Sequence, residues 1–203
     1  MASVRVSGTE GYAEEADELV KRYEGVSFAD NHRSILHLIP PPPCQVLDIG
    51  AGTGRDAAGL AALGHRVVAV EPTAELRTRA MRLHPSPLIE WIDDSLPDLS
   101  VLTGRGDRFD VIMLTAVWMH LDAAQRRRAM PRVAALLAVP GVMMMSVRHG
   151  PVPPGRRMFE VAADETISLA QAAGLRVVVN RPGQPDRLGR DGVTWTRLAF
   201  GQP

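Results

Sequence analysis

Cysteine is nearly absent from the chain, because Cys44 is the only one among 203 residues. This excludes an intrachain disulfide and any zinc or iron–sulfur site that needs several cysteines, and we predict no metal centre. No apolar stretch approaches the roughly 20 residues that span a bilayer, and the stretch 139–145 is interrupted by Pro140 and Gly141. Acidic residues crowd positions 10–18, where a signal peptide would need an apolar segment. We therefore expect a cytoplasmic protein with no membrane partner.

The chain also lacks a surplus of either charge. Lys+Arg and Asp+Glu both number 23, so the formal net charge is +0. Proteins that bind duplex nucleic acid usually carry a basic surplus, so nucleic acid is disfavoured as a partner. Apolar residues at 45% and charged residues at 23% are typical of a globular domain and exclude general disorder. The length suits one domain, covering residues 1–203.

Short β-branched runs alternate with amphipathic segments along most of the sequence. This alternation predicts βαβ units and a mainly parallel sheet. The expected strands are 46–49, 66–70, 88–92, 109–115, 142–147, 175–179 and 193–200. The expected helices are 12–23, 31–39, 55–63, 74–83, 123–138 and 164–173. The segments 149–154 and 181–192 are expected to be the least ordered loops.

Three local signals refine the predicted helices. Thr73 is a candidate N-cap for the helix that follows it, since its hydroxyl can accept from a first-turn N–H. Asp122 and Gln125 have the spacing of a capping box. Pro131 is predicted to kink or break the helix after Asp122, because proline removes one backbone donor and its ring clashes with the preceding turn.

A glycine loop carries the functional argument. The strand 46–49 ends in Gly50-Ala51-Gly52-Thr53-Gly54, and a helix begins at once. Glycines there allow a tight turn and a close approach of backbone to ligand, at the edge of the sheet where ligands of open α/β folds bind. Glu71 ends the second strand, 21 positions after Gly50, and can accept hydrogen bonds from both hydroxyls of a ribose.

The same loop disfavours a nicotinamide oxidoreductase. The dinucleotide fingerprint Gly-x-Gly-x-x-Gly requires its third glycine at position 55, which is Arg55. Asp48, two residues before the first glycine, would repel a polyphosphate and favours a cationic ligand. These departures indicate a ligand with a ribose and a positive charge.

An ordered set of motifs resembles the class I S-adenosylmethionine-dependent methyltransferases. The glycine loop with Asp48 is similar to their first motif, and the segment 68–72 resembles their acidic second-strand motif. The remaining matches are 91–97, 109–115 and 136–141, and the resemblance extends over about 46–200. Val142 departs from the pattern, since many members have a second glycine there.

The resemblance implies the fold of the chain. The expected fold class is α/β, a Rossmann-like methyltransferase fold with helices on both faces of a seven-stranded, mostly parallel sheet. Its strand order would be 3-2-1-4-5-7-6, with the last strand antiparallel. Residues 44–203 would form the Rossmann-like core, and residues 1–43 would form an N-terminal helical lid.

The resemblance also implies the cofactor, S-adenosyl-L-methionine, with S-adenosyl-L-homocysteine as product. Asp48 would hold the methionyl amine, and Glu71 would bind the ribose. The other residues implied to contact the cofactor are Gly50, Ala51 and Gly52 at methionine, Pro72 at adenine, Asp93 or Asp94 at the adenine amine, and Thr115 and Ala116 below the sulfonium.

Residues after the fourth and fifth strands are candidates for the chemistry. His120 and His149 could act as general base for an acceptor that must lose a proton, with His120 favoured by its place after the fourth strand. The candidate substrate-binding residues are Tyr12, Tyr23, Trp118 and Arg148. Simple core packing is the alternative role for the aromatic residues, and a structural or solvated role is the alternative for the histidines and Arg148.

The acceptor is expected to be a small molecule methylated on O or N. Base-amine methyltransferases carry Asp/Asn-Pro-Pro-Tyr after the fourth strand, where this chain has Thr115-Ala116-Val117-Trp118. Cytosine C5 enzymes need a cysteine in that region, and Cys44 precedes the first strand. The alternatives are a protein or RNA methyltransferase and a non-catalytic cofactor-binding protein. The chain is expected to be a monomer or a homodimer.

Overall fold

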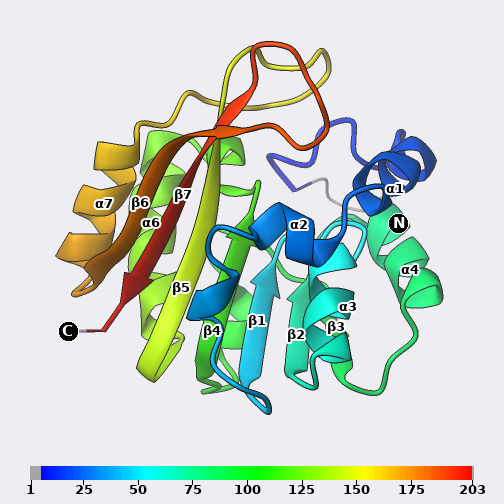
Figure 1. Cartoon of the computed structure of the whole chain (residues 1–203). Helices are drawn as coiled ribbons and strands as arrows, with labels where there is room; N and C mark the ends of the chain where they lie inside the picture. The colour runs from blue at the N-terminus through cyan, green and yellow to red at the C-terminus, as the bar shows by residue number, and fades with distance from the viewer. Residues whose placement is uncertain (1–5, 203) are drawn as a thin grey trace.

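A seven-stranded sheet forms the centre of the computed structural model, which describes residues 6–202 (Figure 1). Its strands are β1 (Gln45–Ile49), β2 (Arg66–Val70), β3 (Ile89–Ile92), β4 (Phe109–Thr115), β5 (Leu137–His149), β6 (Arg176–Pro185) and β7 (Thr194–Gly201). Their order is β3-β2-β1-β4-β5-β7-β6, and β7 runs antiparallel to both of its neighbours. The predicted fold class, strand order and antiparallel last strand are confirmed.

Helices cover both faces of the sheet (Figure 1). They are α1 (Ala16–Glu24), α2 (Phe28–His32), α3 (Arg55–Ala62), α4 (Ala74–Leu83), α5 (Ser100–Thr103), α6 (Ala123–Ala135) and α7 (Ala163–Ala172), with 3₁₀ turns η1 (Leu36–Leu38) and η2 (Trp118–His120). Alternate strand residues face opposite sides. Val46 packs with the residues of α2 and α3, whereas Leu47 packs with those of α6 and α7. Both faces are therefore buried, as the apolar strands predict.

The N-terminal helices differ from the prediction. The helix expected over 12–23 begins only at Ala16, because turns that include Gly8 and Gly11 at positive φ precede it. The helix expected over 31–39 is wrong. Ser27 starts a shorter helix earlier by accepting the N–H of Asp30, and the 3₁₀ turn η1 follows.

Two of the local helix signals are also corrected. Thr73 precedes α4, but its side chain makes no cap hydrogen bond; its backbone N–H donates to Glu71 instead. The capping box of Asp122 and Gln125 is confirmed. Pro131 does not break α6, which continues to Ala135, because the residues around it (129, 130 and 133) are buried against the sheet and hold the helix in place.

The sheet extends further at its antiparallel edge than the sequence predicts. Strand β5 begins at Leu137 and passes through Pro140, with a register irregularity opposite 109–111. Strand β6 continues to Pro185, so the first part of the expected loop 181–192 belongs to a strand that pairs with β7. The turn that follows is fixed by Asp186, which accepts hydrogen bonds from Arg190 and from Trp195. Within residues 6–202, no helix is long and apolar enough to cross a membrane.

The carboxyl ends of the parallel strands and the N-terminal segment meet at one edge of the sheet. In Figure 1 this edge is at the top of β1 and β4, and the segment before α1 lies beside it. Glu15 forms an ion pair with Arg156 (2.8 Å), and Glu24 accepts a hydrogen bond from Thr53 (2.6 Å). Residues far apart in sequence thus enclose a cavity above the strands.

Candidate functional site

The glycine loop forms one wall of this cavity. Gly50 and Gly52 both have positive φ, 71° and 58°, which side chains rarely adopt. A Cβ on Gly50 would come within 2.5 Å of Val117, so that glycine packs closely. A Cβ on Gly52 would meet only the carbonyl of Gly50, at 3.9 Å. The space in front of Gly52 is therefore open to a ligand.

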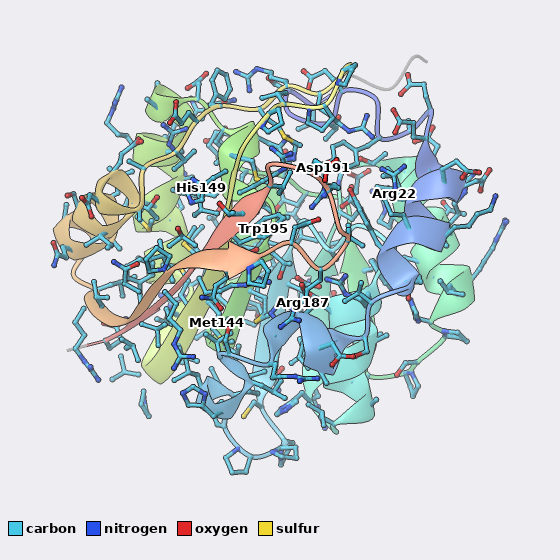
Figure 2. All side chains as sticks on the ribbon, turned by 45° about the horizontal axis from the view of Figure 1, so that its top comes forward. Arg22, Met144, His149, Arg187, Asp191 and Trp195 are labelled. Atoms are coloured by element: carbon cyan, nitrogen blue, oxygen red, sulfur yellow. The ribbon has the colours of Figure 1, made fainter. Side chains whose placement is uncertain are left out.

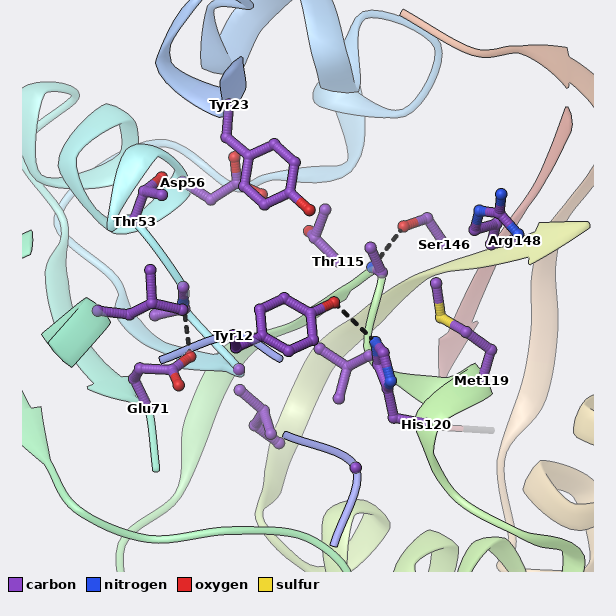
Figure 3. Close-up of a pocket in the computed structure, with 18 of the residues that line it drawn as sticks. Tyr12, Tyr23, Thr53, Asp56, Glu71, Thr115, Met119, His120, Ser146 and Arg148 are labelled. Carbon is purple, nitrogen blue, oxygen red and sulfur yellow. Dashed lines mark hydrogen bonds between the residues drawn. The ribbon is translucent and has the colours of Figure 1, made fainter. Parts of the chain in front are cut away.

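Glu71 is joined to this loop by its carboxylate. One oxygen accepts the N–H of Gly52 and the other accepts the N–H of Thr73, each at 2.8 Å (Figure 3). Burial raises the pKa of Glu71, and these N–H donors partly oppose that rise. Each carboxylate oxygen can accept more than one hydrogen bond. Glu71 therefore fixes the loop and keeps the capacity to accept from a ligand.

Asp48 is a buried carboxylate with an unused oxygen. Its side chain is fully enclosed at the end of β1, and Oδ2 has no hydrogen-bond partner among the described residues. Burial raises the pKa of Asp48 well above its usual range, and the charge of Asp56 raises it further. An unpaired buried carboxylate is unfavourable unless a cation compensates it. Asp48 is thus suited to receive a positively charged group.

Asp56 is a second buried carboxylate near Asp48, but both of its oxygens have partners. Burial would raise its pKa, but His32 and Arg55 together hold it far below its usual range. The Nε2 atom of His32 lies 2.7 Å from Oδ2, and Nε of Arg55 donates to Oδ1 at 2.8 Å. Of these two neighbouring carboxylates, only Asp48 remains available for a ligand.

His120 presents a neutral imidazole to the cavity. Its Nδ1 lies 2.9 Å from the carbonyl of Arg157, which can only accept, so Nδ1 carries the proton. In the neutral ring Nε2 is then an acceptor, and it receives the hydroxyl of Tyr12 at 3.0 Å (Figure 3). Burial lowers the pKa of His120 and raises that of Tyr12, so both side chains stay neutral near pH 7.

The two candidate aspartates for adenine separate in the structure. Asp94 lines the cavity, but its carboxylate accepts the N–H of Ser95 and, at the start of α5, the N–H groups of Val101 and Leu102. Asp93 points away, with a side chain that is 67% exposed and paired with Arg77 at 2.8 Å. Of the two, only Asp94 is placed to meet a ligand.

Two further candidates lie outside the cavity lining. Trp118 is 0% exposed and belongs to the core beneath β4, because η2 turns its ring inward. The prediction that Trp118 walls the acceptor is therefore wrong. His149 bonds through Nε2 to the hydroxyl of Thr196 at 2.8 Å, and it also lies outside the lining. Of the two candidate histidines, therefore, only His120 faces the cavity.

The other candidate residues do line the cavity. They are Tyr12, Gly50, Ala51, Gly52, Glu71, Pro72, Tyr23, Thr115, Ala116 and Arg148. Ala116 adopts a φ of 61°, which is rare for a residue with a side chain, and its N–H donates to Ser146 at 2.9 Å. The strand end is thus held in a strained conformation at the centre of the site.

Sequence reasoning found only Arg148 of the wall that β5, β7 and the β6–β7 loop contribute. Ser146, Trp195 and Arg197 line the cavity with it, and Asp186 and Arg190 lie beside them. Ser146 and Arg148 are two apart on β5, and Trp195 and Arg197 are two apart on β7, but that they share one face is evident only once the β5–β7 register is known. No group of three or more His, Cys, Asp or Glu side chains within 6–202 could hold a metal ion.

The strand order, the glycine turn and the acid after β2 are those that the sequence comparison with class I S-adenosylmethionine-dependent methyltransferases leads us to expect. A family model described as a methyltransferase domain matches residues 46–141.

Two curated proteins are similar to parts of the chain. The protein-L-isoaspartate O-methyltransferase of Chlorobium limicola is 45% identical over 76 residues, which are 37% of this chain and 35% of that protein. An uncharacterized methyltransferase of Mycobacterium bovis is 27% identical over 157 residues, 74% of this chain and 52% of the relative. The chain therefore spans about half or less of these relatives.

One solved structure covers the whole chain. It is the 1,6-didemethyltoxoflavin-N1-methyltransferase of Burkholderia thailandensis, crystallised with 1,6-didemethyltoxoflavin and S-adenosylhomocysteine. Its TM-score is 0.69 at 22% identity, over 100% of this chain and 92% of that one. At this identity the likeness shows the shared fold.

Proposed function

We propose that the protein transfers a methyl group from S-adenosylmethionine to O or N of a small-molecule acceptor. The observation that carries this proposal is the unpaired, buried oxygen of Asp48 beside an open glycine turn. A ligand that brings a positive charge to that point satisfies the carboxylate, and the methionyl ammonium does so. The toxoflavin enzyme, which has this fold and a small acceptor, supports the second half of the proposal.

The acidic end of the cavity, formed by Asp48, Glu71 and the glycine loop, would hold the cofactor. Asp48 would accept from the ammonium, Glu71 from the ribose hydroxyls, and the open side of Gly52 would lie against the methionine part. Pro72 and Asp94 would lie at adenine, and Thr115 and Ala116 below the reacting centre. The bound cofactor supplies an activated methyl group whose bond to sulfur breaks as the new bond to O or N forms, with the electron pair left on sulfur.

His120 would act on acceptors that lose a proton. Its Nε2 lone pair faces the cavity, and burial keeps the ring neutral. An acceptor hydroxyl can replace the hydroxyl of Tyr12 at Nε2 and pass its proton there, while the carbonyl of Arg157 holds the ring in place. Tyr12, and Tyr23 beside it in the lining, would then contact the acceptor.

The N-terminal 43 residues would serve as a lid on the core formed by 44–203. Of the described part, positions 6–9 line the cavity, and a Cβ on Gly8 would lie 3.1 Å from the carbonyl of His120. The contacts of Glu15 with Arg156 and of Glu24 with Thr53 hold this segment over the site. Such a cover excludes water from an alkylation reaction.

The test is to follow labelled methyl. The purified protein is incubated with methyl-tritiated S-adenosylmethionine and, separately, with the small-molecule, protein and RNA fractions of a cell extract. We expect label in the small-molecule fraction, and none of it with a heat-inactivated control. Label confined to protein or RNA would overturn the choice of acceptor. Tight binding of S-adenosylhomocysteine without any transfer would identify a non-catalytic binding protein.

A further inference from the structure

Two buried arginines lie on the wall of the cavity that β5 and β7 form. Ser146 of β5 pairs with Arg197 of β7, and Arg148 pairs with Trp195. Directly paired residues, and residues two apart on one strand, share a face of the sheet. Arg148 and Arg197 are therefore diagonal neighbours on the face that lines the cavity. They are only 6% and 5% exposed.

Neither arginine has an acidic partner. Arg148 donates to the carbonyls of Gly150 and Pro151, and its buried Nε has no partner among the described residues. Arg197 donates to the carbonyl and side-chain oxygens of Asn31. Within 6–202, no carboxylate lies within ion-pair distance of either guanidinium.

The neighbouring Arg190, in contrast, has an acidic partner. Its guanidinium donates to both oxygens of Asp186, at 2.7 and 3.1 Å, and lies over the ring of Trp195. Asp186 also accepts from the indole N–H of Trp195, so its acceptor capacity serves this one turn. The charge of Arg190 is compensated within the chain, whereas those of Arg148 and Arg197 are not.

The electrostatics of the two unpaired arginines agree with this geometry. Burial lowers the pKa of Arg197 to about 10, against the favourable charge of Asp56, which already pairs with His32 and Arg55. Burial also lowers the pKa of Arg148, and the charge of Arg190 lowers it further. Buried charges without counter-ions are unfavourable, and an anion placed between them removes that cost.

We propose that Arg148 and Arg197 bind a carboxylate of the methyl acceptor, so that the substrate class is a small carboxylic acid. This rests on the proposed function and names the acceptor that the same cavity takes. Figure 3 draws Glu71 and Arg148 at opposite sides of the cavity, with Tyr12, Thr115 and His120 between them. An acid anchored at the arginines thus extends toward His120 and the cofactor end.

The form of the two side chains favours a carboxylate. A guanidinium offers a planar fork of donors that matches the two oxygens of a carboxylate. Trp195, over which Arg197 also lies at 5.9 Å, adds an apolar surface next to the fork. Arg187 and Leu188, from the β6–β7 loop, complete that part of the lining, and Figure 2 shows Arg187 and Trp195 near this loop.

The experiment compares benzoate with its uncharged amide, benzamide, on protein saturated with S-adenosylhomocysteine. Binding is measured by calorimetry on the wild type, on Arg148→Met and on Arg197→Met. The matched control is Arg181→Met, because Arg181 pairs with Arg197 across β6 and β7 but is exposed and outside the lining. We expect benzoate to bind at least about tenfold more tightly than benzamide. In each cavity variant the affinity for benzoate should fall about tenfold, whereas in Arg181→Met it should not change.

Three results would overturn the proposal. They are equal affinity of the wild type for benzoate and benzamide, unchanged benzoate binding in both cavity variants, and binding of inorganic phosphate as tight as that of benzoate. The wild-type comparison decides even if a variant fails to fold. Binding of S-adenosylhomocysteine is measured first: its absence would contradict the proposed function, whereas its presence without benzoate binding would contradict only the carboxylate site.

Discussion

The two ends of the cavity are built by different means. At the end where we propose that the cofactor binds (the cofactor end), backbone turns at Gly50 and Gly52 combine with the buried carboxylates of Asp48 and Glu71. At the opposite end, where we propose that the acceptor binds (the acceptor end), the wall consists of long side chains, with arginines that lack acidic partners. One end is acidic and the other basic, although the whole chain has a formal net charge of +0. The balanced net charge of the chain therefore gives no indication that acidic and basic residues are separated within the site.

The ends also differ in how far apart their residues are in the sequence. The cofactor end is formed mainly by 48–72, within two consecutive βα units. The acceptor end joins the N-terminal segment, the residues after β4, and the antiparallel pair β5 and β7. A ligand shared by a family can be bound by a local motif, whereas acceptor specificity depends on contacts that only the folded chain creates.

The largest effect that we expect is at the boundary between the two ends, in the variant His120→Gln. For a hydroxyl acceptor, removing the base should lower the methyl-transfer rate by about 10²–10⁴. Rates are measured with saturating cofactor, and the affinity for S-adenosylhomocysteine is the control, because His120 is not assigned to the cofactor. The wild-type rate should also fall as pH drops through the lowered pKa of His120. Normal turnover by a folded variant would make His120 a packing residue.

Gly52→Val should disrupt only the binding of the cofactor. The new side chain would occupy the open space in front of the loop, and valine is strained at a φ of 58°. We expect a loss of cofactor affinity of about 100-fold or more, measured by calorimetry. Gly174→Val is the matched control, because Gly174 also has positive φ and open space but lies outside the cavity. If both variants bind equally well, the methionine part lies elsewhere.

Glu71→Gln should weaken the binding of S-adenosylmethionine by about 1–3 kcal/mol, roughly 5- to 150-fold. The amide replaces one acceptor oxygen by a donor, which opposes both the ribose hydroxyls and the N–H groups of Gly52 and Thr73. Asp93→Asn is the control, since Asp93 pairs with Arg77 at the surface. An equal loss in Asp93→Asn, or none in Glu71→Gln, would remove Glu71 from the ribose site.

Asp48→Asn should weaken the binding of the cofactor but stabilise the cofactor-free protein. Burial raises the pKa of Asp48 above its unfolded value, so this group destabilises the folded state more as pH rises through the folded pKa. At pH 7 the variant should melt higher, at about 2–4 °C for each kcal/mol regained. Cofactor affinity of the wild type should rise with pH over the same range, because a cation binds the ionised carboxylate. A variant that melts lower, with unchanged affinity, would contradict this role.

The smallest effect is expected for Trp118→Phe. Its indole N–H has no partner among the described residues, and the ring lies in the core. The change should cost stability through lost packing but leave acceptor KM and kcat within about twofold. Thermal melting and steady-state kinetics measure the two effects. A large rise in KM with normal stability would return Trp118 to the acceptor site.

The same contrast explains how much the sequence could predict. The strands 66–70 and 109–115 match β2 and β4 because β-branched and apolar runs between turn residues are local signals. The glycine loop and Glu71 were found for the same reason. Which aspartate faces the cavity was not predictable, because Asp94 and Asp93 are adjacent and differ only in the contacts that α5 and Arg77 offer.

Tertiary pairing decided the rest of the site. Trp118 follows β4 at a position that suits an acceptor wall, yet a 3₁₀ turn buries it. Arg197 lies in a strand whose place beside β5 depends on the whole sheet, so its alternation with Trp195 carried no functional meaning by itself. The proline in α6 was tolerated because packing on the sheet outweighed a local preference.

The most direct test of the account is calorimetric titration of the wild-type protein with S-adenosylmethionine and, separately, with NAD. The unpaired carboxylate of Asp48 favours a cationic ligand in front of the open glycine turn, and we propose that Glu71 accepts from the ribose of that ligand. We expect S-adenosylmethionine to bind with micromolar affinity, about −8 kcal/mol, and NAD to give no measurable heat of binding. Measurable binding of NAD without binding of S-adenosylmethionine would contradict the assignment of the acidic end of the cavity.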